Sequence, residues 1–254
     1  MTNKKPRRGI YLLPNLFTTA AIFCGFYAIV SSINGRFETA AIAIFVAMLL
    51  DGVDGRVARL TNTESDFGAE YDSLADMVSF GLAPALIIYL WALSSLGKIG
   101  WLVSFVYVAC AALRLARFNT QAEHSDKRYF QGLASPSAAA IVAGLIWNGE
   151  LIQEYLTMPV LQIVALLITL FAGLLMVSNV RYHSFKGINW RSKVPFVTIL
   201  MLVFVLVFVS AAPSLVLFAI FFIYSLSGPV LTLILLRRRR AERALHKQQH
   251  DSQD

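Results

Sequence analysis

The chain has 254 residues, of which 57% are hydrophobic and 15% charged, and its mean hydropathy is +0.64. This composition lies outside the range of soluble domains and predicts an all-α integral membrane protein. The formal net charge is +7, but the basic residues form no surface interleaved with aromatic residues, so no nucleic acid is expected as a partner.

Apolar runs of roughly 20 residues, the length of a helix that crosses a bilayer, follow one another along the chain. The first run follows the basic segment MTNKKPRRG but is long for a secretory signal and has no cleavage site, so we expect an uncleaved first helix. The last run is followed by a basic segment, residues 237–254, which we expect to be a partly disordered tail. The runs predict about eight transmembrane helices, at residues 12–33, 38–60, 70–93, 99–118, 132–149, 157–178, 194–211 and 213–236.

Lysine and arginine are distributed unevenly between the two ends of these predicted helices. They are concentrated in the joints that follow the second, fourth, sixth and eighth helices. Because positively charged joints stay on the cytoplasmic side, both termini are expected to face the cytoplasm. The same basic residues would also be attracted to anionic lipid headgroups.

The second predicted helix contains charges within its span. Residues 39–50 are 12 uncharged residues, which as a helix cover roughly 18 Å and fall short of a hydrocarbon core of about 30 Å. The helix must therefore continue through Asp51 and Asp54, which places both carboxylates just inside the cytoplasmic edge of the membrane. Carboxylates in such a position are costly and indicate a functional site.

The third predicted helix carries a second pair of carboxylates. Asp51 and Asp54 are three residues apart and Asp72 and Asp76 are four apart, so each pair lies on one face of its helix. The 17 uncharged residues at 77–93 take the third helix back across the membrane. The two pairs are therefore expected to lie at the same depth on antiparallel helices, and the four carboxylates to converge.

Four carboxylates at one place require protons or cations. Two ionised carboxylates about 4 Å apart repel by roughly 4 kcal/mol at an effective dielectric constant near 20. Oxygen ligands without a nearby histidine or cysteine suit Mg²⁺ or Mn²⁺, and four are enough to bridge two ions. The pattern indicates a two-metal site for phosphoryl transfer.

Nearby glycine and arginine residues fit the same interpretation. Gly55 and Gly68 remove side chains where a nucleotide or a helix backbone comes close. Arg59, one turn beyond Gly55, is able to bind a phosphate with two hydrogen bonds. The alternatives are that the glycines serve helix packing and that Arg59 extends to the membrane interface.

These residues form a continuous signature: Asp51-x-x-Asp54-Gly55-x-x-Ala58-Arg59, then eight residues, then Gly68-x-x-x-Asp72-x-x-x-Asp76. The signature resembles that of the CDP-alcohol phosphatidyltransferase family at every fixed position. The resemblance implies a six-helix core that binds a CDP-linked lipid, from which an alcohol displaces CMP. It also implies that two divalent cations are held by four aspartates, Asp51, Asp54, Asp72 and Asp76, and that Asp76 is also the general base. The residues expected to contact the cytidine diphosphate are Gly55, Arg59 and Gly68, and in the first helix Asn15 and Thr18.

Within that family, three segments resemble the integral-membrane phosphatidylserine synthase branch: SFGLAPA after the last aspartate, RLARFN at 114–119 and GLASPSAAA at 132–140. Ala134 stands where that branch often has proline. The resemblance covers roughly residues 10–180 and implies phosphatidyl transfer from CDP-diacylglycerol to L-serine in a bacterial inner membrane. It divides the chain into a basic N-terminus (1–11), the family core (12–180), an additional pair of transmembrane helices (181–236) and a basic cytoplasmic tail (237–254).

The residues also give a physical reason to expect serine as the acceptor. Its carboxylate needs a cation, and Arg114 and Arg117 lie three residues apart near the cytoplasmic end of the fourth helix, with Asn119 beyond them. Ser135 at the start of the fifth helix offers a hydroxyl. Alternatively, the arginines pair with the aspartates, a lipid phosphate or the diphosphate, and Ser135 caps its helix.

The sequence is also compatible with other functions. The alternative within the same chemistry is another acceptor: glycerol 3-phosphate, inositol phosphate or choline. A cation- or proton-coupled transporter also carries carboxylates in the membrane, although transporters place them at the midplane of paired repeats, which this chain lacks. The oligomeric state is open, with a homodimer as one alternative.

Overall fold

The computed structural model describes residues 12–61, 63, 65–121, 129–183 and 196–251. This part of the chain is almost entirely helical, with one pair of short strands. In chain order the elements are α1 (Leu12–Ile33), α2 (Phe37–Thr61), α3 (Asp66–Asp76), the π-helix η1 (Met77–Leu82), α4 (Ala83–Ile88), the π-helix η2 (Tyr89–Leu93), the 3₁₀ turn η3 (Ser94–Leu96), α5 (Lys98–Gln121), β1 (Tyr129–Gln131), α6 (Ser135–Trp147), α7 (Gly149–Tyr155), α8 (Met158–Val177), β2 (Arg181–His183), α9 (Phe196–Ala211) and α10 (Pro213–Asp251).

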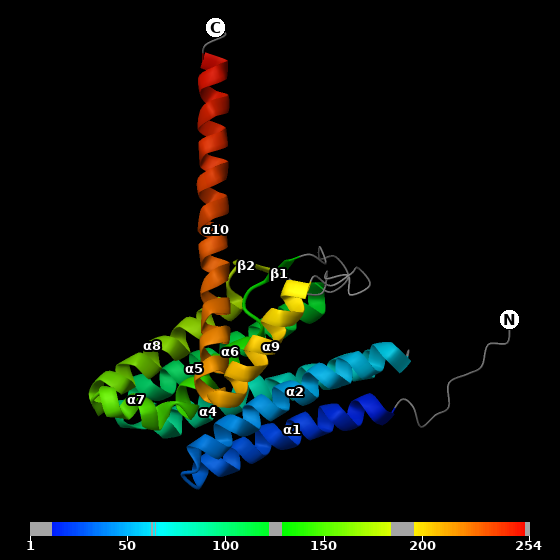
Figure 1. Ribbon diagram of the computed structural model, residues 1–254, viewed down its shortest axis with the longest axis vertical. Helices are drawn as coiled ribbons and strands as arrows, with labels where there is room; N and C mark the ends of the chain where they lie inside the picture. Colours follow the sequence, from blue (N-terminus) through cyan, green and yellow to red (C-terminus); the bar gives the residue numbers. More distant parts are fainter. Residues whose placement is uncertain (1–11, 62, 64, 122–128, 184–195, 252–254) are drawn as a thin grey trace, which may run out of the picture.

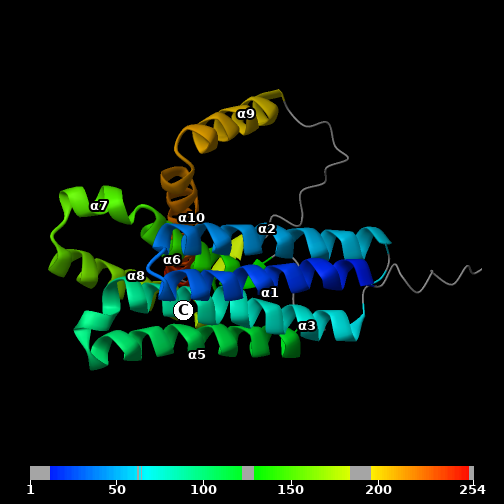
Figure 2. The same ribbon diagram turned by 90° about the horizontal axis from the view of Figure 1, so that it is seen from below.

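The first two helices form an antiparallel pair close to the predicted bounds. The turn between α1 and α2 needs a positive φ, which Gly35 supplies at 72°. Figure 2 shows α1, α2, the α3 to α4 run and α5 lying side by side, with their long axes in a common direction. This arrangement brings the C-terminal end of α2 beside the N-terminal end of α3.

The third predicted helix is one continuous helical run, but it changes its winding directly after Asp76. There the chain enters the π-helix η1, before α4 begins at Ala83 with Pro84 in its first turn. Proline has no backbone N–H, so the carbonyl of Phe80, four residues earlier, loses its usual helical donor. The Tyr107 hydroxyl of α5 donates to that carbonyl oxygen at 3.1 Å.

Helix α6 is the centre of the molecule, and its residues 138–146 are all buried. Three consecutive alanines at 138–140 let neighbouring helices approach closely, as small residues do in membrane proteins. The predicted helix at 132–149 begins only at Ser135, because the chain turns at Gly132 with a φ of 78°. A Cβ at Gly132 would lie 2.2 Å from the carbonyl oxygen of Met176, so only glycine fits.

A two-stranded antiparallel sheet joins the two segments that flank α6 and α8. Strands β1 and β2 pair with Phe130 opposite Tyr182. The backbone N–H of Gly132 extends the link by donating to the carbonyl of Val180 at 2.9 Å. The hydropathy pattern did not indicate these strands, because each has only three residues.

The last two helices differ in direction from the others. Figure 1 shows α10 rising out of the body across the direction of α1 and α2, and Figure 2 shows it end-on with α9 set apart from the bundle. Helix α10 contacts α6 and β2 through its first half. It continues as helix to Asp251, so the expectation of a partly disordered tail is wrong for residues 237–251.

Within the described residues, five helical segments are long and apolar enough to cross a membrane, and Ser135–Trp147 is an apolar but shorter helix. The chain is therefore an all-α integral membrane protein. The charged end of α2 and the 16-residue length of α9 keep these two helices out of the five. The five segments are Leu13–Ile33, Asp66–Leu96, Lys98–Thr120, Met158–Val177 and Pro213–Ile234.

Candidate functional site

The connection between α2 and α3 sets the position of the acidic residues. Ser65 is the N-cap of α3, with an extended backbone, and its Oγ accepts from the backbone N–H of Gly68 at 3.1 Å. At the end of α2 the hydroxyls of Thr61 and Thr63 lie 2.7 Å apart. These local bonds involve the last residue of α2, Thr63 and the N-cap of α3, and α3 begins beside the helix that precedes it (Figure 2).

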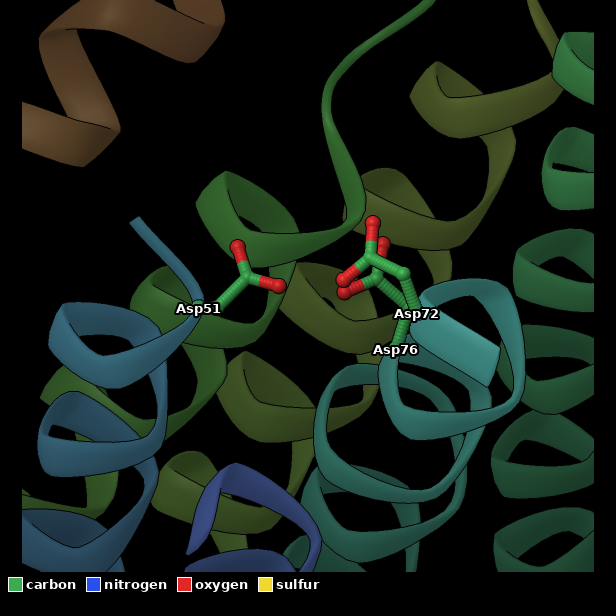
Figure 3. A group of neighbouring side chains, drawn as sticks. All are labelled: Asp51, Asp72 and Asp76. Carbon is green, nitrogen blue, oxygen red and sulfur yellow. The ribbon is translucent and has the colours of Figure 1, made fainter. Parts of the chain in front are cut away.

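Three of the predicted carboxylates come together between α2 and α3. Asp51, Asp72 and Asp76 each offer an oxygen, and these oxygens all lie within 4.8 Å of one another. Figure 3 shows the Asp51 side chain extending from α2 toward Asp72 and Asp76, which extend from α3. The three side chains are partly buried. The convergence expected from the sequence therefore holds for these three residues.

Asp54, the fourth aspartate, has a different immediate environment. Its side chain is buried, and its Oδ2 accepts a hydrogen bond of 2.8 Å from the Thr18 hydroxyl of α1. Thr18 is predicted to contact the nucleotide, and in the structure its hydroxyl is bonded to this aspartate. Asp54 shares the lining of a pocket with Asp72, so it still faces the same space.

The cluster is electrostatically incomplete. Asp72 and Asp76 each have a buried Oδ1 without a hydrogen-bond partner among the described residues. Carboxylate oxygens this close repel one another, and a buried acceptor without a partner costs about 1–3 kcal/mol. A divalent cation with oxygen ligands would remove both costs, so the residues present fit such an ion.

A pocket of about 250 Å³ adjoins the cluster, between α1, α2 and α3. Of the five residues predicted to contact a cytidine diphosphate, four line it, and Arg59 does not. The pocket is lined by Pro14, Asn15, Thr18, Asp54, Gly55, Ala58, Thr63, Ser65, Gly68, Ala69 and Asp72.

The two signature glycines have different surroundings. A Cβ added at Gly55 would meet nothing within 4 Å, although Gly55 lines the pocket. Packing between helices therefore does not account for glycine at this position. A Cβ at Gly68 would lie 3.2 Å from the Ser65 Oγ, so Gly68 also serves the N-cap. The exposed side chain of Arg59 folds back on its own helix, where its Nε donates to the carbonyl of Gly55 at 2.8 Å.

Arg114 connects the cluster to α6. Its Nη1 donates to the Ser135 hydroxyl at 2.7 Å, and the guanidinium interacts electrostatically with Asp76. The Nε of Arg114 is buried and has no hydrogen-bond partner among the described residues. The structure thus brings Arg114 and Ser135 together beside the carboxylates and leaves one donor available.

The two other residues expected at the acceptor site lie further along α5 and have protein partners. The Nη2 of Arg117 donates to Gln131 of β1 and, at 2.7 Å, to the Oδ1 of Asn179. Asn119 exchanges hydrogen bonds with the Ser73 hydroxyl at 3.1 and 3.2 Å. Arg117 therefore ties α5 to the β1 and β2 region, and Asn119 ties it to α3.

The sequence did not reveal two residues, Ser79 and Gly25, that pack the helix of Asp76 against α1. Ser79, in the π-helix after Asp76, is fully buried and donates to the carbonyl of Ala21 in α1 at 3.0 Å. A Cβ at Gly25 would lie 2.7 Å from the Ser79 Oγ, so α1 packs tightly against this turn. The available signals were a serine and a glycine within apolar runs, and neither type is specific enough to reveal the pairing.

The chain is similar to known proteins over most of its length. A family model described as CDP-alcohol phosphatidyltransferase matches residues 11–234. The chain is similar to the CDP-diacylglycerol--serine O-phosphatidyltransferase of Helicobacter pylori strain 26695, with 42% identity over 226 residues, 87% of this chain and 92% of the relative. A protein of the same name from Bacillus subtilis is 35% identical over 174 residues, 68% of this chain and 91% of the relative. One from Methanocaldococcus jannaschii is 38% identical over 144 residues, 57% of this chain and 63% of the relative.

Proposed function

The chain belongs to the CDP-alcohol phosphatidyltransferase family, and from this premise we propose that it transfers the phosphatidyl group of CDP-diacylglycerol to L-serine, giving phosphatidylserine and CMP. The observation that carries the proposal is the cluster of Asp51, Asp72 and Asp76 beside a pocket between α1, α2 and α3. The names of the relatives from H. pylori and B. subtilis support serine as the acceptor.

In this proposal the four aspartates hold two divalent cations, Mg²⁺ or Mn²⁺. The buried, unpartnered oxygens of Asp72 and Asp76 support this role, as does the donor set, which consists of oxygen alone. When bound, the cations supply positive charge that stabilises the phosphate oxygens as CMP leaves. Thr18 orients Asp54 for its part in this set.

The cytidine diphosphate occupies the pocket. Asn15 and Thr18 offer polar groups from α1, and Gly55 and Gly68 leave room for the nucleotide to approach the backbone. Arg59 releases its hydrogen bond to the Gly55 carbonyl when it turns toward a phosphate. The diacylglycerol part of the substrate remains among the membrane lipids.

Serine enters on the side of Arg114. The Nε of Arg114 has no partner among the described residues and is available to the serine carboxylate, and Ser135 holds the guanidinium in place. Asp76, which interacts with Arg114, accepts the proton of the serine hydroxyl. The serine oxygen bonds to the phosphorus attached to diacylglycerol, and the bond from that phosphorus to CMP breaks. Arg117 and Asn119 support this region through their protein partners.

The proposed location is a bacterial inner membrane, with both termini and the site facing the cytoplasm, as the lysine and arginine distribution predicts. We keep the proposed division of the chain into a basic N-terminus (1–11), a core (12–180), a C-terminal helix pair (181–236) and a basic tail (237–254). The family match extends to residue 234 and thus includes the C-terminal pair.

The test is an assay of the purified full-length chain in mixed micelles with CDP-diacylglycerol and Mn²⁺ or Mg²⁺. L-serine, glycerol 3-phosphate, inositol phosphate and choline are supplied in turn, and CMP release is measured. We expect CMP release only when L-serine is the alcohol supplied. EDTA should abolish the release, and restoring the cation should recover it. No release with any alcohol would reject the enzyme, and release with another alcohol but not serine would reject the acceptor.

A further inference from the structure

Helix α10 lies outside the proposed core and yet packs firmly against it. A Cβ at Gly144 of α6 would lie 3.0 Å from the Phe218 side chain of α10, so these two helices are in close contact. The ring of Phe221 in α10 lies 6.4 Å from the ring of Phe45 in α2, centroid to centroid. Helix α10 therefore has a defined position over the central helix.

One buried tyrosine packs directly against α10. Tyr182 of β2 is 0% exposed, and its hydroxyl donates to the backbone carbonyl of Ser225 at 2.9 Å. Burial raises the pKa of the Tyr182 phenol, so the phenol stays protonated and remains a donor. A Cβ at Gly228 would lie 2.4 Å from the Cζ of Tyr182, so the Tyr182 ring lies directly against the α10 backbone.

This contact places Tyr224 beside the proposed acceptor site. The rings of Tyr182 and Tyr224 are 5.4 Å apart and tilted by 42°. Tyr224 interacts electrostatically with Arg114, which in turn interacts with Asp76 and donates to Ser135. Tyr182, Tyr224, Arg114 and Asp76 thus connect β2 and α10 to the carboxylate cluster.

We propose that Tyr224 is a positioning residue of the acceptor site: its phenol orients the Arg114 guanidinium toward the serine carboxylate, and Tyr182 holds Tyr224 in place. Helix α10 thereby completes a site whose other residues come from α2, α3, α5 and α6. This inference rests on the proposed function, because it assumes that Arg114 binds the acceptor. An oriented guanidinium loses less entropy when it binds a carboxylate, and this favours serine over alcohols that have none.

The test uses Tyr224→Phe in the full-length chain, because phenylalanine keeps the ring against Tyr182 and removes only the hydroxyl. We expect the KM for L-serine to rise about tenfold, with the KM for CDP-diacylglycerol changed less than twofold and the melting temperature in detergent unchanged. The matched control is Tyr155→Phe, which makes the same change at an exposed position in α7. We expect the control to keep all three values.

A double-mutant cycle with Arg114→Lys separates positioning from packing. If Tyr224 acts through Arg114, the double variant has a serine KM close to that of Arg114→Lys alone. An unchanged serine KM in Tyr224→Phe, a parallel rise of both KM values with a lower melting temperature, or additive effects in the cycle would each overturn the inference. A chain that releases no CMP with serine before any substitution would instead overturn the proposed function, and the inference with it.

Discussion

The charged side chains at the site differ in how fully they are hydrogen-bonded. Asp54 has the hydroxyl of Thr18, and Arg114 has the hydroxyl of Ser135. Asp72 and Asp76 each keep a buried oxygen without a partner among the described residues. An arrangement that leaves acceptors unsatisfied stores free energy, which a bound ion or substrate releases.

At the residue scale, substitution of Asp76 tests the proposed role of this carboxylate as the general base. Asp76→Asn should lower turnover at least about 10²-fold, because asparagine cannot accept the proton of the attacking hydroxyl. Asparagine also removes one charge from a repelling cluster, so the melting temperature in detergent should be unchanged or higher. CMP release and thermal unfolding are measured on the same preparation.

The control for this substitution is Asp66→Asn, in the exposed first turn of the same helix. It removes the same charge and should keep full activity. Normal turnover in Asp76→Asn would remove Asp76 as the base.

Gly55 and Gly52 form a second matched pair, because a Cβ at either position meets nothing within 4 Å. Only Gly55 lines the pocket. Alanine at either position should stabilise α2 by about 0.5–1 kcal/mol, and Gly55→Ala alone should raise the KM for CDP-diacylglycerol, by about tenfold. Lipid titrations of CMP release check this, and equal KM values in the two variants would mean that the nucleotide does not approach Gly55.

At the scale of elements, the helix changes from α to π winding directly after Asp76. The π-helix η1 and Pro84 change the winding of the helix just beyond the carboxylates, and Tyr107 donates to the Phe80 carbonyl, which lacks an N–H donor four residues on because that residue is Pro84. π-helical turns often occur at functional sites, where they alter the direction of a side chain. Here the turn begins at the residue after the proposed base.

This interpretation predicts coupling between Tyr107 and Pro84. Tyr107→Phe should lower the free energy of unfolding by about 1–3 kcal/mol, because a buried carbonyl loses its donor. Pro84→Ala restores a backbone N–H, so the cost of Tyr107→Phe should be smaller in the Pro84→Ala background. Unfolding curves in detergent for the two single variants and the double variant measure the coupling, and strictly additive losses would contradict it.

The helices were largely predictable because their apolar runs match the thickness of a bilayer, as for Leu12–Ile33 and Met158–Val177. The π-helices, β1 and β2 were not, because three to six residues carry too little periodicity. The direction of α10 also escaped prediction, since hydropathy reports length and polarity but not the neighbour that a helix packs against.

Within the site, the aspartates were predictable because each pair has helical spacing, and Gly55 and Gly68 were part of a fixed pattern with them. The bond from Thr18 to Asp54 joins residues 36 positions apart, and no local signal in the sequence records such a pairing. The same reason hides Tyr224, which interacts electrostatically with Arg114 although it lies 110 positions further along the chain.

At the scale of the whole molecule, the turn between α1 and α2 and the start of α3 lie at opposite ends of the helix pair. The proposed orientation places the first on the periplasmic side of the inner membrane and the second on the cytoplasmic side. We expect Asn34→Cys to react with a membrane-impermeant maleimide in intact cells, and Asp66→Cys to react only after the cells are permeabilised.

The labelling background for both variants is a chain with Cys24→Ala and Cys110→Ala, which removes the native thiols. The reverse labelling pattern would mean that the carboxylate cluster faces away from the cytoplasm.

Helices α2 and α3, which carry the carboxylate cluster, also expose large apolar side chains. Leu49 and Leu60 of α2 are 69% and 83% exposed, and Phe67 and Leu74 of α3 are 68% and 64% exposed. We expect those of these side chains that lie within the bilayer to face acyl chains, and a lipid substrate to reach the site by lateral diffusion without leaving the bilayer. The enzyme therefore experiences a two-dimensional concentration. We expect dilution of CDP-diacylglycerol with inert lipid to slow the reaction even at constant total substrate, and added buffer at a fixed lipid ratio to leave the rate unchanged.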